Sequence, residues 1–141
     1  MSVFWDASAL AHVCVPGQIT RAARDLVRTD SIVVWWSTPL EVRSVLNRVR
    51  REGAISSASA RASWERASGL LSGSLMIPPA DAVKESALAQ LDRFPLKASD
   101  ALQLAAALVW CKQSPRGRCF VCNDRQLLTA ASACGFEVHS V

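Results

Sequence analysis

The amino-acid sequence predicts an α/β fold with a mostly parallel central sheet of about four to five strands. Short apolar runs alternate with helical segments along all 141 residues, which favours parallel strands joined by crossover helices. Half of the residues are hydrophobic, as expected for a folded chain with a sizeable core. We find no repeat, linker or low-complexity stretch, so residues 1–141 are predicted to form a single domain.

Periodicity and helix-ending residues define six elements in the first half of the chain. Residues 2–5 alternate across the sheet, with Val3 and Trp5 expected on one face and Phe4 on the other. Thr38 is the expected N-cap of the third helix, which Gly53 ends. The predicted elements are a strand at 2–5, helices at 7–15 and 18–30, a strand at 31–36, and helices at 38–53 and 56–73.

The second half continues the alternation. Two prolines close a short strand, and Gly135 ends the last helix. The helix around Leu104 is very apolar and is expected to pack in the centre of the molecule. The predicted elements are a strand at 74–79, helices at 80–94 and 97–113, a strand at 116–123, a helix at 124–135 and a strand at 136–140.

The composition narrows the function classes. The net charge is +4 and arginine outnumbers lysine, which favours contacts with phosphate groups. No apolar run approaches the length of a membrane span and no signal peptide is evident, so we expect a cytoplasmic protein without a membrane partner. The pair Cys119 and Cys122 lies in an apolar strand, where buried reduced thiols are a better explanation than a zinc or redox site.

Four acidic residues lie where helices begin beside the predicted sheet. They are Asp6 after the first strand, Glu41 in the first turn after the second strand, Asp100 at the start of the apolar helix and Asp124 after "RCFVC". Each also has a local explanation. Asp6 and Asp124 are possible N-caps, Glu41 completes a capping box with Thr38, and the charge of Asp100 suits a helix N-terminus.

The shared location expected for the four acids favours a functional site over separate capping roles. Sites in open α/β sheets form at the carboxyl ends of the strands, where all four acids are expected. Like charges near 4 Å repel by about 4 kcal/mol per pair at an effective dielectric constant of 20, whereas a cap contributes about 1 kcal/mol. A hard divalent cation such as Mg²⁺, which prefers oxygen ligands, offsets that repulsion. An acidic metal site in a basic protein suits phosphodiester chemistry.

The segments around these acids resemble the four motifs of the PIN domain. The segments are "DASAL" from Asp6, "PLEVRSVLNR" around Glu41, "ASDALQLAAA" around Asp100 and "VCNDRQLLTAASACGFEV" around Asp124. They are most similar to the VapC-type ribonuclease toxins of bacterial type II toxin–antitoxin pairs. The resemblance covers nearly the whole chain and implies a three-layer PIN-like fold, with helices on both faces of the sheet.

The resemblance implies an endoribonuclease that depends on Mg²⁺, with Mn²⁺ as a substitute. Asp6 and Asp100 would be the main metal ligands, Glu41 would complete the site, and Asp124 would be an outer or second-metal ligand. Attack by a metal-activated water would leave a 5′-phosphate and a 3′-hydroxyl. Ser8 and Arg125 are possible accessory residues, the first by bonding to the acids and the second by contacting RNA.

The resemblance also implies the partners: an RNA substrate, a cognate antitoxin protein that neutralises the toxin, and a second copy of the chain in a homodimer. Tryptophans are enriched in interface hot spots, although most of those in this chain are expected in the core. Arg21, Arg24 and Arg43 are further candidate RNA contacts.

Two other functions are compatible with parts of the sequence. In the first, the acids serve only as caps, and the chain is a catalytically weak or inactive PIN-like module that binds RNA or protein. Cys122 supports that reading, because PIN proteins usually carry serine or threonine two residues before the fourth acid. The second, a phosphotransfer enzyme, is less favoured because no D-x-D pair follows the first strand.

Overall fold

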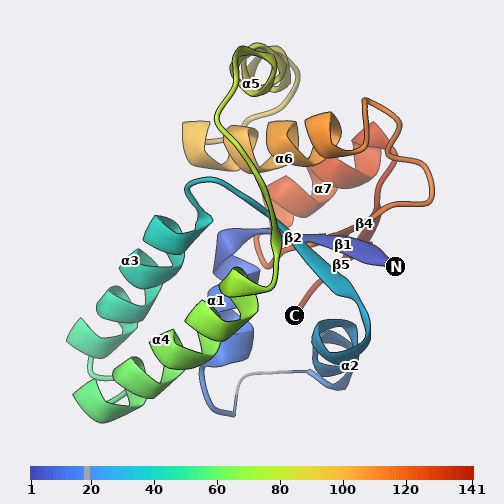
Figure 1. The fold of residues 1–141 in the computed structure, drawn as a ribbon. Helices are drawn as coiled ribbons and strands as arrows, with labels where there is room; N and C mark the ends of the chain where they lie inside the picture. The colour runs from blue at the N-terminus through green and yellow to red at the C-terminus, as the bar shows by residue number, and fades with distance from the viewer. Residues whose placement is uncertain (18–19) are drawn as a thin grey trace.

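The computed structural model describes residues 1–17 and 20–141 (Figure 1). The described strands are β1 (Ser2–Trp5), β2 (Ser31–Trp35), β3 (Leu75–Ile77), β4 (Cys119–Val121) and β5 (Glu137–His139). The helices are α1 (Ala7–Cys14), α2 (Arg21–Thr29), α3 (Thr38–Arg51), α4 (Ser57–Ser72), α5 (Asp81–Arg93), α6 (Ala98–Trp110) and α7 (Arg125–Cys134). The predicted α/β class is confirmed.

The five strands form one sheet in the order β3-β2-β1-β4-β5, and every pair is parallel. β1 is central, since Phe4 is in register with Val33 on β2 and with Phe120 on β4. The carboxyl ends of all strands therefore meet at one edge of the sheet. A residue that follows β1 lies in the middle of that edge.

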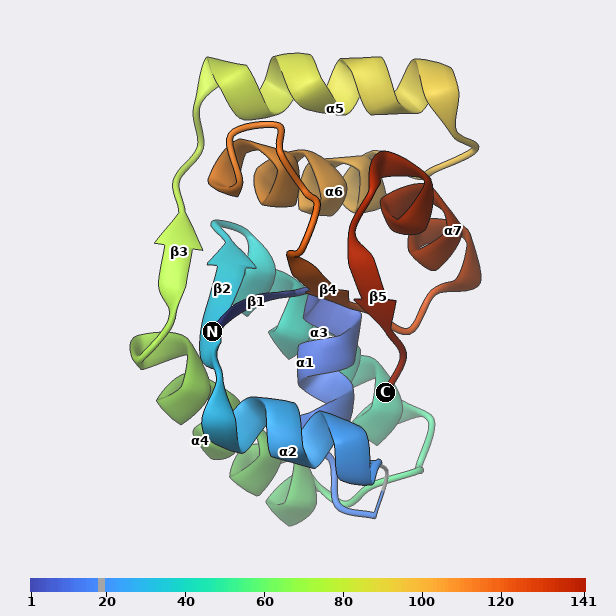
Figure 2. The ribbon, with the colours of Figure 1, turned by 90° about the vertical axis from the view of Figure 1, so that its right-hand side faces the viewer.

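Helices cover both faces of the sheet and produce the three-layer, PIN-like arrangement (Figure 1). α1 to α4 lie on one side, and α6 and α7 lie on the other, with α5 packed outside α6 (Figure 2). β1 alternates between the two cores as predicted. Val3 and Trp5 join the core beneath α1, whereas Phe4 stacks on Phe120 at 5.3 Å in the core beneath α6.

The apolar helix α6 is the centre of the second core, as its sequence predicts. Its residues 104–107 are fully buried between the sheet and α5. The alanines in this run let α6 approach the sheet closely, because they project little beyond the backbone. This packing holds the first turn of α6, which contains Asp100, near the carboxyl edge of the sheet.

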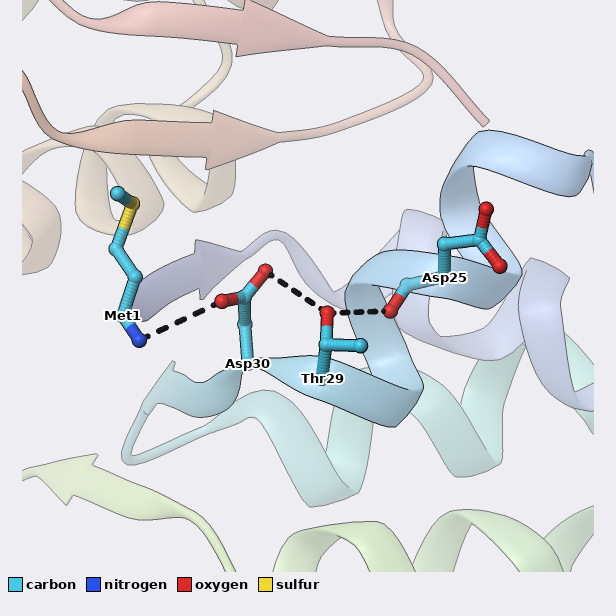
Figure 3. Close-up of polar contacts among 4 residues, drawn as sticks. All are labelled: Met1, Asp25, Thr29 and Asp30. Atoms are coloured by element: carbon cyan, nitrogen blue, oxygen red, sulfur yellow. Dashed lines mark hydrogen bonds and ion pairs between the residues drawn. The ribbon is translucent and has the colours of Figure 1, made fainter.

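At the amino edge of the sheet, polar contacts join the start of the chain to the segment between α2 and β2. The backbone nitrogen of Met1 lies 3.5 Å from Asp30 Oδ1, and the Thr29 hydroxyl donates to the Asp25 carbonyl at 2.8 Å (Figure 3). The same hydroxyl lies 3.5 Å from Asp30 Oδ2. These contacts hold the start of β1 beside the start of β2, where the Ser31 N–H also donates to the Met1 carbonyl.

Several element boundaries differ from those predicted. α2 begins at Arg21, because the Thr20 hydroxyl accepts the Ala23 N–H as an N-cap. The first two residues of the predicted helix at 18–30, positions 18 and 19, lie outside the described residues. β2 ends at Trp35, so Trp36 belongs to a turn and is 50% exposed instead of buried in the strand.

The predicted N-cap of α3 is wrong. Thr38 is the first helical residue, and its hydroxyl accepts the Trp35 N–H at 3.2 Å, so that it closes the turn after β2. Ser37 occupies the cap position. The sequence favours Thr38 because threonine precedes proline there, but tertiary packing buries Thr38 completely and uses its hydroxyl within the turn.

Candidate acidic site

The structure places all four predicted acids at the carboxyl edge of the sheet. Asp6 directly follows the central strand β1, and Glu41 lies in the first turn of α3 after β2. Asp124 lies between β4 and α7, and Asp100 is in the first turn of α6. Burial and the neighbouring charges of Asp100 and Glu41 raise the pKa of Asp6. The charges of Asp124 and Glu41 likewise raise the pKa of Asp100. The four carboxylates therefore interact electrostatically.

Asp6 is the buried member of this group. It is 3% exposed, and its backbone N–H donates to the Val121 carbonyl at 2.9 Å, extending the pairing of β1 with β4. Burial is the main cause that raises the pKa of Asp6 from 3.8 to about 7, although the Ser8 hydroxyl lowers it by donating to Oδ2. The predicted accessory residue Ser8 is therefore in contact with the first acid.

Glu41 is held by donors on both oxygens. The Ser37 hydroxyl donates to Oε1 at 2.5 Å, one helical turn before it. The Gln103 side-chain amide donates to Oε2 at 3.3 Å from α6. These two bonds orient the carboxylate between α3 and α6.

Asp100 and Asp124 lie closer to solvent. Burial raises the pKa of Asp100, and the charges of Asp124 and Glu41 add to that effect while Lys97 opposes it. Asp124 is exposed, and its Oδ1 accepts the Leu127 N–H at 2.8 Å, which caps α7. Arg125 is the first residue of α7 and is exposed beside Asp124.

The cap explanation holds for only one of the four acids. Asp124 is an N-cap, as the local reading of the sequence suggests. Asp6 occupies the cap position of α1, but within residues 1–17 and 20–141 its side chain accepts no capping N–H. Glu41 binds the Ser37 hydroxyl in place of a backbone N–H, so the predicted capping box with Thr38 is wrong. Capping therefore does not account for Asp6 and Glu41.

The donor chemistry of the edge suits a hard divalent cation. All four acids supply oxygen, the ligand type that Mg²⁺ prefers. Among the described residues none of them forms an ion pair with lysine or arginine, so the buried charge of Asp6 has no cationic partner. In the same residues, however, no three His, Cys, Asp or Glu side chains converge closely enough to hold one ion. Asp6, Glu41 and Asp124 instead accept hydrogen bonds from protein donors.

Cys122 lies beneath this edge and keeps its proton. It is fully buried on β4, and its thiol donates to the Asp124 carbonyl at 3.5 Å. Burial and the nearby Asp6 charge both raise the pKa of this thiol. The thiol therefore adds no negative charge to the cluster. All five cysteines are free in the described chain, and Cys119 and Cys122 are buried, as predicted for that pair.

A small cavity of about 140 Å³ opens beside the acids. Ser8, which bonds to Asp6, and Asn123, which precedes Asp124, line it together with His12 and Arg48. The four acids themselves are not among its lining residues.

Sequence reasoning missed two residues of the site, Ser37 and Gln103. Gln103 follows Asp100 by three residues, so helical spacing predicts that both share a face of α6. Its bond to Glu41 depends on how α6 crosses the sheet edge, which has no local sequence signal. Ser37 precedes Glu41 by four residues, a spacing that was available in the sequence.

Comparison with known proteins defines the class of fold. No family model and no curated protein matches the chain. The fold is similar to that of a toxin–antitoxin complex from Klebsiella pneumoniae, with 15% identity over 88% of each chain and a TM-score of 0.59. It is also similar to the crystal structure of PAE2754 from Pyrobaculum aerophilum, with 20% identity over 98% of this chain and 89% of that chain and a TM-score of 0.61. At these identities the likeness establishes the fold. Across the part of the chain described here, no helix combines the length and hydropathy needed to cross a membrane.

Proposed function

We propose that this chain is a metal-dependent endoribonuclease toxin of the PIN-domain, VapC type. The observation that carries the proposal is Asp6, a buried carboxylate at the end of the central strand without a cationic partner among the described residues. Glu41, Asp100 and Asp124 surround it at the same edge. Groups with strongly perturbed pKa values cluster at functional sites. The likeness to a chain of a toxin–antitoxin complex supports the toxin role.

In the proposed reaction, Asp6 and Asp100 would hold Mg²⁺ or Mn²⁺, and Glu41 and Asp124 would complete the oxygen set. Such a cation, when bound, would supply an acidified water molecule and positive charge opposite the scissile phosphate. Ser8 orients Asp6, and Ser37 and Gln103 orient Glu41 through the hydrogen bonds described above. Arg125, beside Asp124, is positioned for contact with an RNA phosphate.

Cleavage of RNA tests this proposal. The purified chain is incubated with 5′-labelled cellular RNA in Mg²⁺, in Mn²⁺ and in EDTA, and cleaved ends are mapped for 5′-phosphates. We expect cleavage with either metal and none in EDTA, and a loss of at least about 100-fold in the Asp6→Asn variant, because a charged ligand is removed. An Asp6→Asn variant as active as its parent would refute the assignment.

The proposed partners are a cognate antitoxin and a second copy of the chain. Co-expression with the product of a neighbouring gene is expected to raise the yield of folded protein, and light scattering of the purified chain is expected to give the mass of a dimer. We place the protein in the cytoplasm, where RNA and an antitoxin would be encountered together.

One observation favours a second function, a binding module without catalysis. Asp6, Glu41 and Asp124 accept hydrogen bonds from protein donors, and among the described residues no three His, Cys, Asp or Glu side chains are grouped closely enough to hold one metal ion. Titration calorimetry with Mn²⁺ and Mg²⁺ distinguishes the two functions. Uptake of the metal that disappears in Asp100→Asn supports the nuclease, whereas no uptake supports the binding module.

A further inference from the structure

A groove of about 350 Å³ lies between α3 and α4. These two helices are on the side of the molecule away from α5 to α7 (Figure 1). Its polar lining consists of Arg43, Asn47 and Arg50 from α3, and Ser57, Arg61 and Trp64 from α4. We call this the arginine groove. It is larger than the cavity beside the acids.

The two helices build the groove from matching stripes. Residues 43, 47 and 50 follow one another at helical spacing on α3, and residues 57, 61 and 64 do so on α4. Leu46 and Ala60 are buried and form the floor where the helices pack. Three arginine side chains therefore line a single space.

These arginines have no acidic partner. Among the described residues, no carboxylate lies within 4.0 Å of Arg43, Arg50 or Arg61. The Arg43 guanidinium instead stacks over the Trp64 ring, 4.0 Å from its centroid. Like charges gathered without counter-charges attract an anionic ligand, and the stacked pair presents a planar donor group beside an aromatic one.

The groove continues toward the acidic site. Arg43 and Trp64 also line an apolar shelf with Pro39 and Leu40, and Leu40 is 66% exposed. Leu40 directly precedes Glu41 on α3. Arg50 follows Glu41 by nine residues, which corresponds to about 14 Å along the helix at 1.5 Å per residue. A single-stranded RNA that leaves the acids covers that distance within a few nucleotides.

We propose that the arginine groove binds the RNA substrate at a few nucleotides from the cleaved bond. The inference rests on the proposed ribonuclease function and adds to it a second contact surface for the same strand. Guanidinium forks match phosphate oxygens. The half-buried ring of Trp64 and the adjacent exposed Leu40 offer apolar area against which a base can stack. A nucleotide presents both groups together, whereas an acidic peptide supplies charge without a regular series of flat rings.

Binding of RNA in the absence of cleavage tests the groove. The Asp6→Asn background in EDTA is titrated against a fluorescein-labelled 12-nucleotide single-stranded RNA, with anisotropy measured from 50 to 300 mM KCl. The variant R43Q/R50Q/R61Q is compared with K84Q/K112Q/R116Q, which removes the same charge from exposed positions on the other side of the sheet. Thermal melts confirm that each variant is folded.

We expect the groove variant to bind at least tenfold more weakly at 100 mM KCl, and the control to change by less than threefold. Three lost phosphate contacts lower the slope of log K against log salt by about 2, at about 0.7 per contact for single strands. Trp64→Leu keeps the charge, so it weakens binding severalfold while the salt slope stays the same. An equal loss of RNA affinity in the groove variant and in the control variant would overturn the proposal.

A competitor separates RNA from an acidic protein segment. A glutamate oligopeptide of the same total charge is added to the RNA complex. Displacement only at concentrations at least tenfold above those of unlabelled RNA supports the assignment, and equal potency assigns the groove to an acidic peptide and overturns it. The nuclease proposal fails by a different result. In that case the parent does not cleave RNA in Mg²⁺, while RNA binding that depends on the groove persists.

Discussion

The side-chain amide of Gln103 donates a hydrogen bond to Glu41 Oε2 at 3.3 Å and joins α6 to α3 across the acidic edge. Gln103 is fully buried, and its Oε1 has no hydrogen-bond partner within the described part of the chain. A buried orphan oxygen costs about 1–3 kcal/mol. The residue therefore orients the Glu41 carboxylate at a cost to the stability of the fold.

Replacing Gln103 by leucine is expected to separate function from stability. Mn²⁺ affinity and RNA cleavage should fall by about 10-fold or more, as for other residues that orient metal ligands. The free energy of unfolding should change by less than about 1 kcal/mol, because loss of the bond to Glu41 and removal of the orphan Oε1 have opposite effects of similar size. Calorimetry and urea unfolding measure the two quantities.

Gln90→Leu is the matched control for that variant. Gln90 is also a buried glutamine, but it lies on α5 and accepts the Cys134 thiol away from the acids. It should leave Mn²⁺ affinity unchanged. Equal Mn²⁺ affinity in Gln103→Leu and the parent would contradict a role for Gln103 in orienting Glu41.

The pKa of Asp6 predicts that the metal-free protein becomes less stable as pH rises. Burial raises this pKa from 3.8 to about 7, so the folded state holds the proton more tightly than the unfolded state. The resulting stabilisation is complete below pH 4 and is lost between about pH 4 and 7. Asp6→Asn removes the titration. In EDTA at pH 8 it should therefore be more stable than the parent by up to about 4 kcal/mol, at 1.36 kcal/mol per pKa unit.

Urea unfolding at pH 4.5 and pH 8 tests this difference, which should shrink to about 1 kcal/mol at the lower pH. Asp92→Asn, on the exposed side of α5, should show no such pH dependence. A parent and an Asp6→Asn variant of equal stability at pH 8 would show that the folded protein does not strain this carboxylate.

Metal uptake is expected to displace the Asp6 proton. With a pKa of about 7, Asp6 is mostly protonated at pH 6, and a carboxylate must lose its proton to bind a cation. Mn²⁺ titration at pH 6 in buffers of different ionisation enthalpy should reveal release of about one proton per site, and almost none at pH 8.5. Proton release that is the same at both pH values would exclude Asp6 from the ligand set.

Asp124 allows capping and catalysis to be tested apart. Asp124→Ser retains an oxygen that can accept the Leu127 N–H, so stability should change by less than about 0.5 kcal/mol, whereas Asp124→Ala should lose about 1 kcal/mol. Both variants remove the carboxylate, and both should cleave RNA at least about 10-fold more slowly if it helps to hold the metal.

The cap of α2 provides the control. Thr20 accepts the Ala23 N–H at 3.1 Å, and Thr20→Ala should cost about 1 kcal/mol without altering cleavage. Full activity in Asp124→Ser would leave capping as the sole role of Asp124.

The fold was predictable from sequence because its local signals agree with its tertiary structure. The alternation around Phe4 requires Phe4 on one face of a sheet and both of its neighbours, Val3 and Trp5, on the other, and the structure has this arrangement. The apolar run around Leu104 has no polar face, so a helix there must be covered on both sides. The location of the four acids at one edge follows from the parallel connection alone.

Details that depend on packing could not be predicted in this way. Thr38 and Ser37 are both suitable caps, and only the turn after β2 decides which hydroxyl serves Trp35 and which serves Glu41. The arginine groove also cannot be recognised from the sequence of either helix alone, because Arg50 and Arg61 line the same space only when α3 packs against α4.

The central place of β1 has a consequence for synthesis on the ribosome. Its second neighbour, β4, lies more than a hundred residues later in the chain, and the Asp6 N–H bonds to the last residue of that strand. Because chains emerge from the amino terminus, the first acid is made early but acquires its surroundings only after β4 has left the exit tunnel. A nascent chain halted before that point lacks the assembled acidic edge, so translation itself delays the appearance of any activity that depends on it.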